Sequence, residues 1–214
     1  MKIKKEPRVA APFLLDINML TRELIAAFSK RELLPVDVND VKSFIIENGI
    51  QDEIEFIGVE FDTDILQGWF KRFRRQTGVY GDTVNCTNIF YPINQSYDWQ
   101  RFICCKELLH VLDPEQSRVV SEDQIRDLAT KIGLPREMQD PLRDGEHTWS
   151  DRIAEFQALA VLFPMDCRNI LMEPLKKEQI SVSDIAKLVD IPRKYVGLAM
   201  SPLWDSFHSQ LLKL

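Results

Sequence analysis

The sequence has few of the residues that build metal knuckles or disulfide frameworks. Only four of its 214 residues are cysteines: Cys86, Cys104, Cys105 and Cys167. No two of them have the CxxC spacing of a zinc knuckle, and the adjacent pair is poorly suited to a disulfide framework. We therefore expect free, mostly buried thiols, as is usual for proteins kept in a reducing compartment.

Long apolar runs are also absent. No stretch approaches the roughly 18 consecutive apolar residues that span a bilayer. The basic N-terminus, residues 1–6, is not followed by the apolar core and small-residue cleavage site of a signal peptide. A hydrophobic content of 45% and a charged content of 28% are typical of globular proteins. These features predict a cytoplasmic protein without a membrane-bound segment.

The sequence lacks the net positive charge that is usual in nucleic-acid-binding proteins. Its formal net charge is −6, so a nucleic-acid partner is not expected. A local exception is the basic cluster of Lys71, Arg72, Arg74 and Arg75, which alternates with aromatic residues in a predicted strand and hairpin region at 66–75. Two interpretations stay open for this cluster: a solvated strand face, or a contact for nucleic acid or an acidic partner.

The order of the predicted elements indicates an α+β fold. Apolar spacing predicts a helix from Ile17, with Asp16 as its N-cap, and a second helix over about 37–48. Strands are predicted at 54–61 and 84–93, on either side of the basic cluster. Further helices are predicted at about 98–112, 121–132, 149–163, 165–172, 181–190, 192–200 and 203–212. Helices, then a small sheet, then more helices are typical of α+β proteins.

The segment 101–110 contains Lys106-Glu107-x-x-His110, which matches the H-E-x-x-H helix of zinc metallopeptidases except at its first position. In such helices two imidazoles four residues apart bind one zinc ion, and the Glu polarises the zinc-bound water. Lys106 replaces the first imidazole, and an ammonium group has no lone pair with which to ligate a metal. Glu107 therefore holds the general-base position of an altered site. Taken alone, Glu107 and His110 also fit an ordinary hydrogen-bonded polar patch on a helix.

Together with its surroundings, this segment resembles the ImmA/IrrE-type zinc metallopeptidases. Residues 99–110 are similar to the family signature R-F-T-x-A-H-E-L-G-H, and residues 87–94 are similar to the strand that precedes it. Residues 151–164 resemble the helix E-x-x-A-x-x-F-A-x-x-L-L-M-P, which supplies the third zinc ligand in that family. The resemblance implies a zincin-like metallopeptidase core over 13–173, built from a small sheet and the active-site helices.

Several positions depart from the family pattern. Lys106 stands at the first ligand position, Leu109 replaces a small Gly, and Asp151 stands where the family has its ligand Glu. These departures predict a degenerate member, a pseudoenzyme that holds no cofactor. A buried carboxylate that loses its metal must protonate or find another cation. Our hypothesis is that Lys106 is that cation and pairs with Asp151, with Glu155 one turn further along the same helix, or with Glu107.

A metal site with substituted ligands is the alternative. His147 lies four residues before Asp151, so a helix that begins early would place both on one face. His110, His147 and Asp151 would then offer two nitrogens and one oxygen to a zinc ion, with water as the fourth ligand. Pro141, Gly145 and Thr148 instead favour a loop or a helix cap at His147, and a histidine in a loop is usually solvated.

The C-terminal region, residues 174–214, is predicted to be helical and resembles a helix-turn-helix. One helix is followed by a short turn and by Pro192, which suits the first position of a second helix. Only Arg193 and Lys194 give the second helix positive charge, so a role in reading DNA is weakly supported. We expect this pair to contact a protein partner.

Residues 1–12 lack periodicity and are expected to form a flexible tail.

Three functions are consistent with these patterns. The first is a metallopeptidase-like protein with an inactivated zinc site that works as a regulatory, protein-binding module, with a repressor or a stress-response protein as its partner. The second is an active metallopeptidase with non-standard ligands that cleaves a regulatory protein. The third is a DNA-binding regulator that uses the C-terminal helices and the basic cluster. Members of the resembled family commonly cleave or relieve repressors, which favours regulatory partners in the first two cases.

Overall fold

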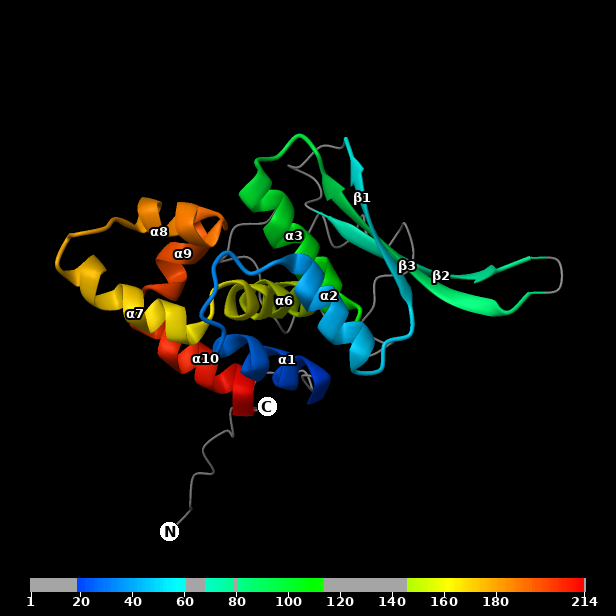
Figure 1. Cartoon of the computed structure of the whole chain (residues 1–214), viewed down its shortest axis with the longest axis horizontal. Coiled ribbons are helices and arrows are strands. Elements are labelled where there is room, and N and C mark those ends of the chain that lie inside the picture. The colour runs from blue at the N-terminus through cyan, green and yellow to red at the C-terminus, as the bar shows by residue number, and fades with distance from the viewer. Residues whose placement is uncertain (1–18, 61–67, 79–80, 114–145, 214) are drawn as a thin grey trace, which may run out of the picture.

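A computed structural model describes residues 19–60, 68–78, 81–113 and 146–213, with the side chains of 146–150 outside the description. Figure 1 shows helices packed beside a small sheet. The helices are α1 (Met19–Ser29), α2 (Val38–Glu47), α3 (Tyr97–His110), α6 (Glu146–Leu162), α7 (Met165–Lys176), α8 (Val182–Val189), α9 (Arg193–Ala199) and α10 (Leu203–Lys213). The strands are β1 (Glu53–Val59), β2 (Trp69–Gln76) and β3 (Thr83–Pro92). The fold is α+β, as predicted from the sequence.

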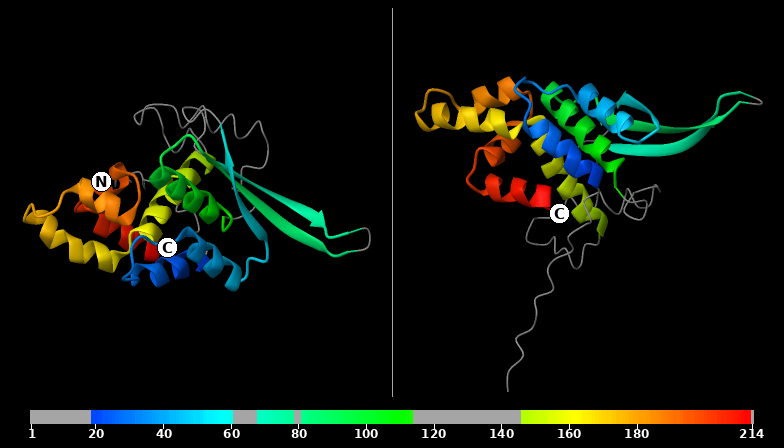
Figure 2. Two further views of the ribbon diagram at one scale, coloured as in Figure 1. Left: turned by 45° about the horizontal axis from the view of Figure 1, so that its top comes forward. Right: turned by 60° about the horizontal axis from the view of Figure 1, so that its bottom comes forward.

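The sheet has β3 at its centre, with β1 parallel and β2 antiparallel to it. The first residue of β1, Glu53, pairs with Cys86, whereas β2 continues to a pair between Gln76 and Thr83. The end of β2 and the start of β3 therefore run beyond β1 as a two-stranded ribbon. Both views in Figure 2 show this hairpin projecting away from the helices.

Helix α3 is the central helix of the fold, because all its residues from Arg101 to Leu109 are buried. It packs against α6, α2 and the strands β2 and β3. The apolar residues of this buried stretch, from Phe102 to Leu109, lie on several sides of the helix, which is typical of a helix covered all round. The exceptions are three charged residues, Arg101, Lys106 and Glu107, which are also buried. Each of these charges needs partners, since an isolated buried charge is strongly destabilising.

The C-terminal helices share one hydrophobic core with the rest of the described chain. Trp204 of α10, Val196 of α9 and Ile185 of α8 belong to the same cluster of buried residues as Leu108 of α3 and Leu159 of α6. Figure 1 shows these helices at the end of the molecule opposite the hairpin. The region expected at 174–214 is helical, and it packs directly on the segment expected to form the metallopeptidase-like core.

Arg101 connects three parts of the chain. Its guanidinium donates hydrogen bonds to the backbone carbonyl oxygens of Val36, Val189 and Asp190, and it also forms an ion pair with the Asp190 side chain at 3.4 Å. The planar guanidinium can donate in several directions at once, which suits it to this position. The N-terminal helices, α3 and the turn after α8 are thereby held together.

The pair α8 and α9 forms a helix-turn-helix-like unit. Ser181 and Asp184 make a reciprocal capping box at the start of α8, and the helix lies within the predicted range 181–190. Asp190 ends α8 in the left-handed conformation, with φ of 55°, and Pro192 is the N-cap of α9. This left-handed residue allows the sharp turn between the two helices.

Two helices have a boundary that differs from the predicted one by three residues or more. Helix α6 begins at Glu146 rather than at 149, and α7 continues to Lys176 rather than ending at 172. Helix α7 runs through Pro174, which removes one backbone hydrogen bond. Leu171 and Leu175, on either side of the proline, pack on the core, and this contact offsets the loss. The expected tail, the Asp16 N-cap and the expected helix at 121–132 lie outside the described residues.

Two expectations from composition concern membrane-spanning helices and cysteines. Among the described residues, none of the helices has the length and apolarity required to cross a membrane. All four cysteines are unpaired and buried, which confirms the prediction of free thiols. Burial raises the pKa of the Cys104 thiol to about 12, with a further contribution from the nearby Glu107 carboxylate. A thiol with so high a pKa is a poor nucleophile at neutral pH.

Candidate functional site: a buried lysine between two helices

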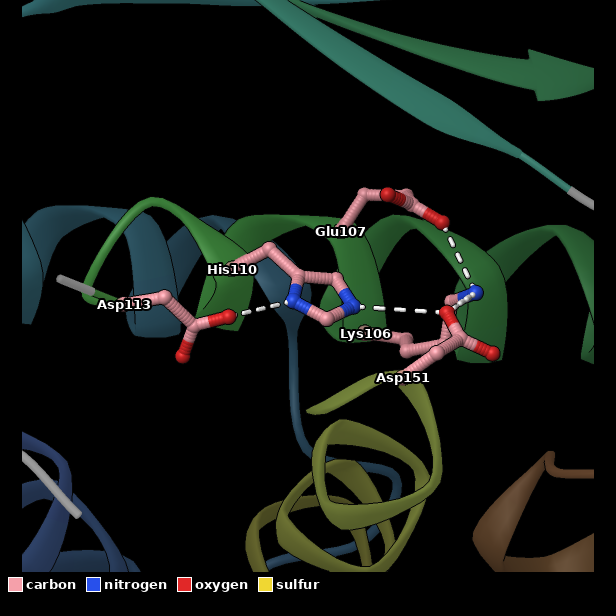
Figure 3. A network of polar contacts seen from close by, with 5 residues as sticks. All are labelled: Lys106, Glu107, His110, Asp113 and Asp151. Carbon is pink, nitrogen blue, oxygen red and sulfur yellow. Dashed lines mark hydrogen bonds and ion pairs between the residues drawn. The ribbon is translucent and has the colours of Figure 1, made fainter. Parts of the chain in front are cut away.

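The side chains of the K-E-x-x-H segment meet Asp151 between α3 and α6. Lys106 Nζ lies 2.6 Å from Asp151 Oδ1 and 2.9 Å from Glu107 Oε1. Figure 3 shows Asp151 reaching from the start of α6 to a position between Lys106 and His110 of α3. The pairing of Lys106 with Asp151 and Glu107, hypothesised from the sequence, is present. One ammonium group thus connects α3 and α6.

All three members of this ion-paired group are removed from solvent. Lys106, Glu107 and Asp151 have exposed fractions of 5%, 3% and 7%. Burial by itself lowers the pKa of Lys106, but attraction to Asp151 and then to Glu107 outweighs it and leaves the pKa above its usual value. Burial raises the pKa of Asp151, and attraction to Lys106 and His110 outweighs it and holds the pKa below its usual range. Lys106 and Asp151 are therefore both charged at neutral pH.

His110 is held between two carboxylates. Its Nδ1 lies 2.6 Å from Asp113 Oδ2, its Nε2 lies 3.4 Å from Asp151 Oδ1, and its ring lies parallel to that of Phe70. Burial lowers the pKa of His110, but attraction to Asp113 and hydrogen bonds to Asp113 and Asp151 raise it to about 10. The ring therefore carries both protons at neutral pH, and each nitrogen donates to a carboxylate.

Glu107 Oε1 is within ion-pair distance of Lys106, yet this oxygen has no hydrogen bond of good geometry. We regard the contact as an ion pair, because the 2.9 Å separation allows strong attraction even where the hydrogen-bond angle is poor. The backbone of Gly68 passes close by: a Cβ atom at this position would lie 3.1 Å from Glu107 Oε1 and 2.5 Å from Ile103 Cγ2. Glycine is therefore required where β2 begins, beside the site.

Two residues that contact the site have no signal in the sequence. Asp113 follows α3 and binds His110, and Tyr195 comes from α9, far along the chain. The Tyr195 ring stacks on Phe102 of α3 at a centroid distance of 3.8 Å. Burial raises the pKa of Tyr195, and the neighbouring Glu155 raises it further. The Tyr195 hydroxyl is buried without a hydrogen bond of good geometry, although Glu155 lies near it.

Glu155 borders the site one turn after Asp151. Burial raises its pKa and the charge of Asp151 raises it further, while Lys106 and Lys194 lower it. Glu155 is thus close enough to sense the lysine electrostatically, but the ion pairs of Lys106 are those with Asp151 and Glu107. Of the three carboxylates predicted as partners of Lys106, Asp151 and Glu107 are in direct contact with it and Glu155 is not among its ion pairs.

The remaining predicted residues lie apart from this group or outside the description. His147 is in the first turn of α6, so the helix begins early enough to put it one turn before Asp151, but its side chain is outside the described part. Arg193 and Lys194 are exposed on α9. The Lys194 ammonium lies 4.6 Å from the Trp99 ring centre and 4.5 Å from that of Tyr195.

The family resemblance implies a zinc ion, and the described side chains do not fit one. Both ring nitrogens of His110 already lie beside carboxylate oxygens, and the ammonium of Lys106 occupies the position beside Asp151 Oδ1. Among the described residues, no group of three or more His, Cys, Asp or Glu side chains is arranged to hold a metal ion. A divalent ion at this place would have to displace two cations from the same carboxylate.

Comparison with protein-family models gives no match to the chain, and no curated protein matches it. The resemblance to the ImmA/IrrE type rests on the sequence motifs alone. What the geometry can do chemically follows from its charges. A lysine paired with two buried carboxylates is well suited to holding two helices together, and it is poorly suited to activating a water molecule.

Proposed function

We propose that this chain is a metallopeptidase-like pseudoenzyme of the ImmA/IrrE type, with a zincin-like core, that acts as a regulatory, protein-binding module. The single observation that carries the proposal is the distance of 2.6 Å between Lys106 Nζ and Asp151 Oδ1. The lysine supplies the positive charge that a zinc ion would supply in an active relative. The helices keep their arrangement while the Lewis acid and its activated water are lost.

The physical basis is charge compensation. Asp151 and Glu107 are buried, and a buried carboxylate without a cation costs several kcal/mol. A fixed ammonium meets that need permanently, independently of any metal. The proposed partner is a repressor or another regulatory protein. Arg193 and Lys194, which are exposed on α9, are proposed as part of its contact surface. DNA is a less suitable partner for this pair, since Lys194 lies over two aromatic rings.

An active metallopeptidase with substituted ligands is the second candidate. The observation that favours it is the early start of α6 at Glu146, which puts His147 and Asp151 one helical turn apart. His110, His147 and Asp151 would form the ligand set, and Glu107 would act as the general base. This candidate requires His110 to lose a proton and Lys106 to withdraw from Asp151.

Metal analysis of three purified proteins tests the proposal. Wild type and Lys106→Met are expected to hold no stoichiometric zinc after incubation and desalting, whereas Lys106→His is expected to hold about one equivalent, because it restores the paired imidazoles. Lys106→Met is the matched control, since it removes the ammonium without adding a ligand. Stoichiometric zinc in the wild type, together with cleavage of a protein substrate that Glu107→Gln abolishes, would overturn the proposal in favour of the enzyme.

A further inference from the structure

The β2–β3 hairpin extends from the body of the protein as a narrow arm (Figures 1 and 2). Strand β2 is an edge strand, and within the described residues its only neighbour is β3. The backbone groups on its other side are thus open to pairing with a further extended chain. The final pairs of the hairpin, from Arg74 opposite Asn85 to Gln76 opposite Thr83, lie beyond the start of β1.

The arm has the opposite charge to the protein as a whole. Residues 69–92 contain four cationic side chains and a single acid, Asp82, whereas the complete chain has a net charge of −6. Two of the four cations are neutralised within the sheet, since Arg72 binds Asp52 and Arg75 binds Glu53. The other two cations of the arm are Lys71 and Arg74, both on β2.

Lys71 and Arg74 are both exposed, and neither has an acidic partner among the residues that the structure describes. Arg74 is the third residue after Lys71, so the two side chains lie on opposite faces of β2 and about 10 Å apart along the strand. Phe73 lies between them and is 36% exposed. An extended chain along the open edge of β2 also alternates its side chains between the two faces, so it can reach both cations.

We propose that the β2–β3 hairpin is a docking arm for an acidic, extended segment of a protein partner. The segment lies along the open edge of β2, where two carboxylates pair with Lys71 and Arg74. Main-chain hydrogen bonds to an edge strand supply affinity, and the paired charges select an acidic sequence. This inference goes beyond the proposed function, because it stands on the charges and the edge of the hairpin whatever the Lys106 site binds.

The number of unpaired cations favours a protein segment over duplex DNA. Proteins that bind duplex DNA by its backbone commonly make about 6–10 phosphate contacts. On the described part of the arm two cations are without an acidic partner, Lys71 and Arg74, and they face in opposite directions. That arrangement suits two carboxylates on alternate faces of one strand.

Binding of fluorescently labelled poly-L-glutamate to the full chain at low ionic strength tests this proposal by anisotropy. Wild type is expected to bind, and the double variant Lys71→Ala/Arg74→Ala is expected to bind about fivefold more weakly or worse, as the loss of two solvent-accessible ion pairs implies. The control Lys176→Ala/Lys213→Ala removes the same charge from exposed positions on α7 and α10, and it is expected to stay within about twofold of wild type.

Hydrogen exchange on the same samples supplies the second readout. Backbone amides of β2 are expected to exchange more slowly when poly-L-glutamate is bound, because the open edge becomes hydrogen-bonded. The proposal is overturned by absent binding, by equal weakening in the control variant, or by β2 amides that stay unprotected in the complex. Tighter binding to a duplex DNA of similar length, lost in the Lys71→Ala/Arg74→Ala variant, would overturn the choice of partner.

Discussion

Replacing Lys106 with methionine removes the ammonium while keeping an unbranched side chain of similar length. Asp151 and Glu107 then remain buried without the cation that lies 2.6 Å and 2.9 Å from them. Breaking a buried ion pair on one side typically costs about 3–5 kcal/mol, because the remaining charge is uncompensated. Since small domains have a total stability of about 5–15 kcal/mol, the variant is expected to lose a large fraction of it.

The loss should also depend on pH. In wild type the pKa of Asp151 is held below its usual range, so its stabilising contribution is present above about pH 4 and is lost only as the pH falls through that lowered pKa. Without Lys106, burial is opposed by His110 and no longer by the ammonium, so the pKa of Asp151 is higher in the folded variant than in the folded wild type. The free energy of unfolding of the variant is therefore expected to be closest to that of wild type near pH 4–5, where the carboxyl group protonates. The difference between the two free energies should grow as the pH rises.

Urea unfolding of four proteins between pH 4.5 and pH 8, read by circular dichroism, gives the measurement: wild type, Lys106→Met, Asp151→Asn and the double variant. In the double variant no buried charge at Asp151 is left uncompensated, so the sum of the two single losses should exceed the loss of the double variant by more than about 1 kcal/mol. A loss below about 1 kcal/mol in Lys106→Met, as for a surface pair, or strictly additive losses, would refute the reasoning.

Three further predictions concern stability. Because the pKa of His110 is raised to about 10 in the folded protein, its protonation stabilises the fold fully below about pH 6.5, and this contribution disappears as the pH rises through 10. The variant His110→Asn should therefore show a weaker dependence of the unfolding free energy on pH between about 6.5 and 10. Arg101→Lys should lose about 2–4 kcal/mol in urea unfolding, because an ammonium cannot bond the three carbonyl groups that the guanidinium reaches; unchanged stability would contradict this. Gly68→Ala should cost about 1–3 kcal/mol by crowding Ile103, whereas Gly197→Ala, in open space on α9, should gain about 0.5–1 kcal/mol in thermal unfolding. Equal effects at the two glycines would contradict the account of the close approach at β2.

Local signals in the sequence were sufficient for most of the fold. The capping box at Ser181 and the apolar spacing of α1 act within a few residues, so their effects can be read directly from the chain. The extension of α7 through Pro174 could not be predicted from the sequence, because it depends on tertiary packing of the residues around the proline. Helix breakers predict an end only where no such packing opposes them.

The candidate site was predicted where a residue type imposes a requirement and was missed where only proximity matters. A lysine on the buried face of a helix must find carboxylates, and the resemblance placed Asp151 on the neighbouring helix. Tyr195 reaches the same region from α9 because the C-terminal helices share the core, and no local pattern encodes that contact. The carbonyl contacts of Arg101 were missed for the same reason, since a backbone acceptor leaves no mark in the sequence.

The proposed function requires a lysine ammonium that permanently takes the place of a metal ion. Nitrogen-detected NMR of the lysine side chains reports it directly, because a buried, hydrogen-bonded ammonium exchanges its protons slowly and gives a distinct signal. We predict one such signal at pH 8, absent in Lys106→Met and unchanged by one equivalent of zinc. Loss or displacement of that signal on adding zinc, with a shift of the His110 ring to its neutral form, would contradict the claim.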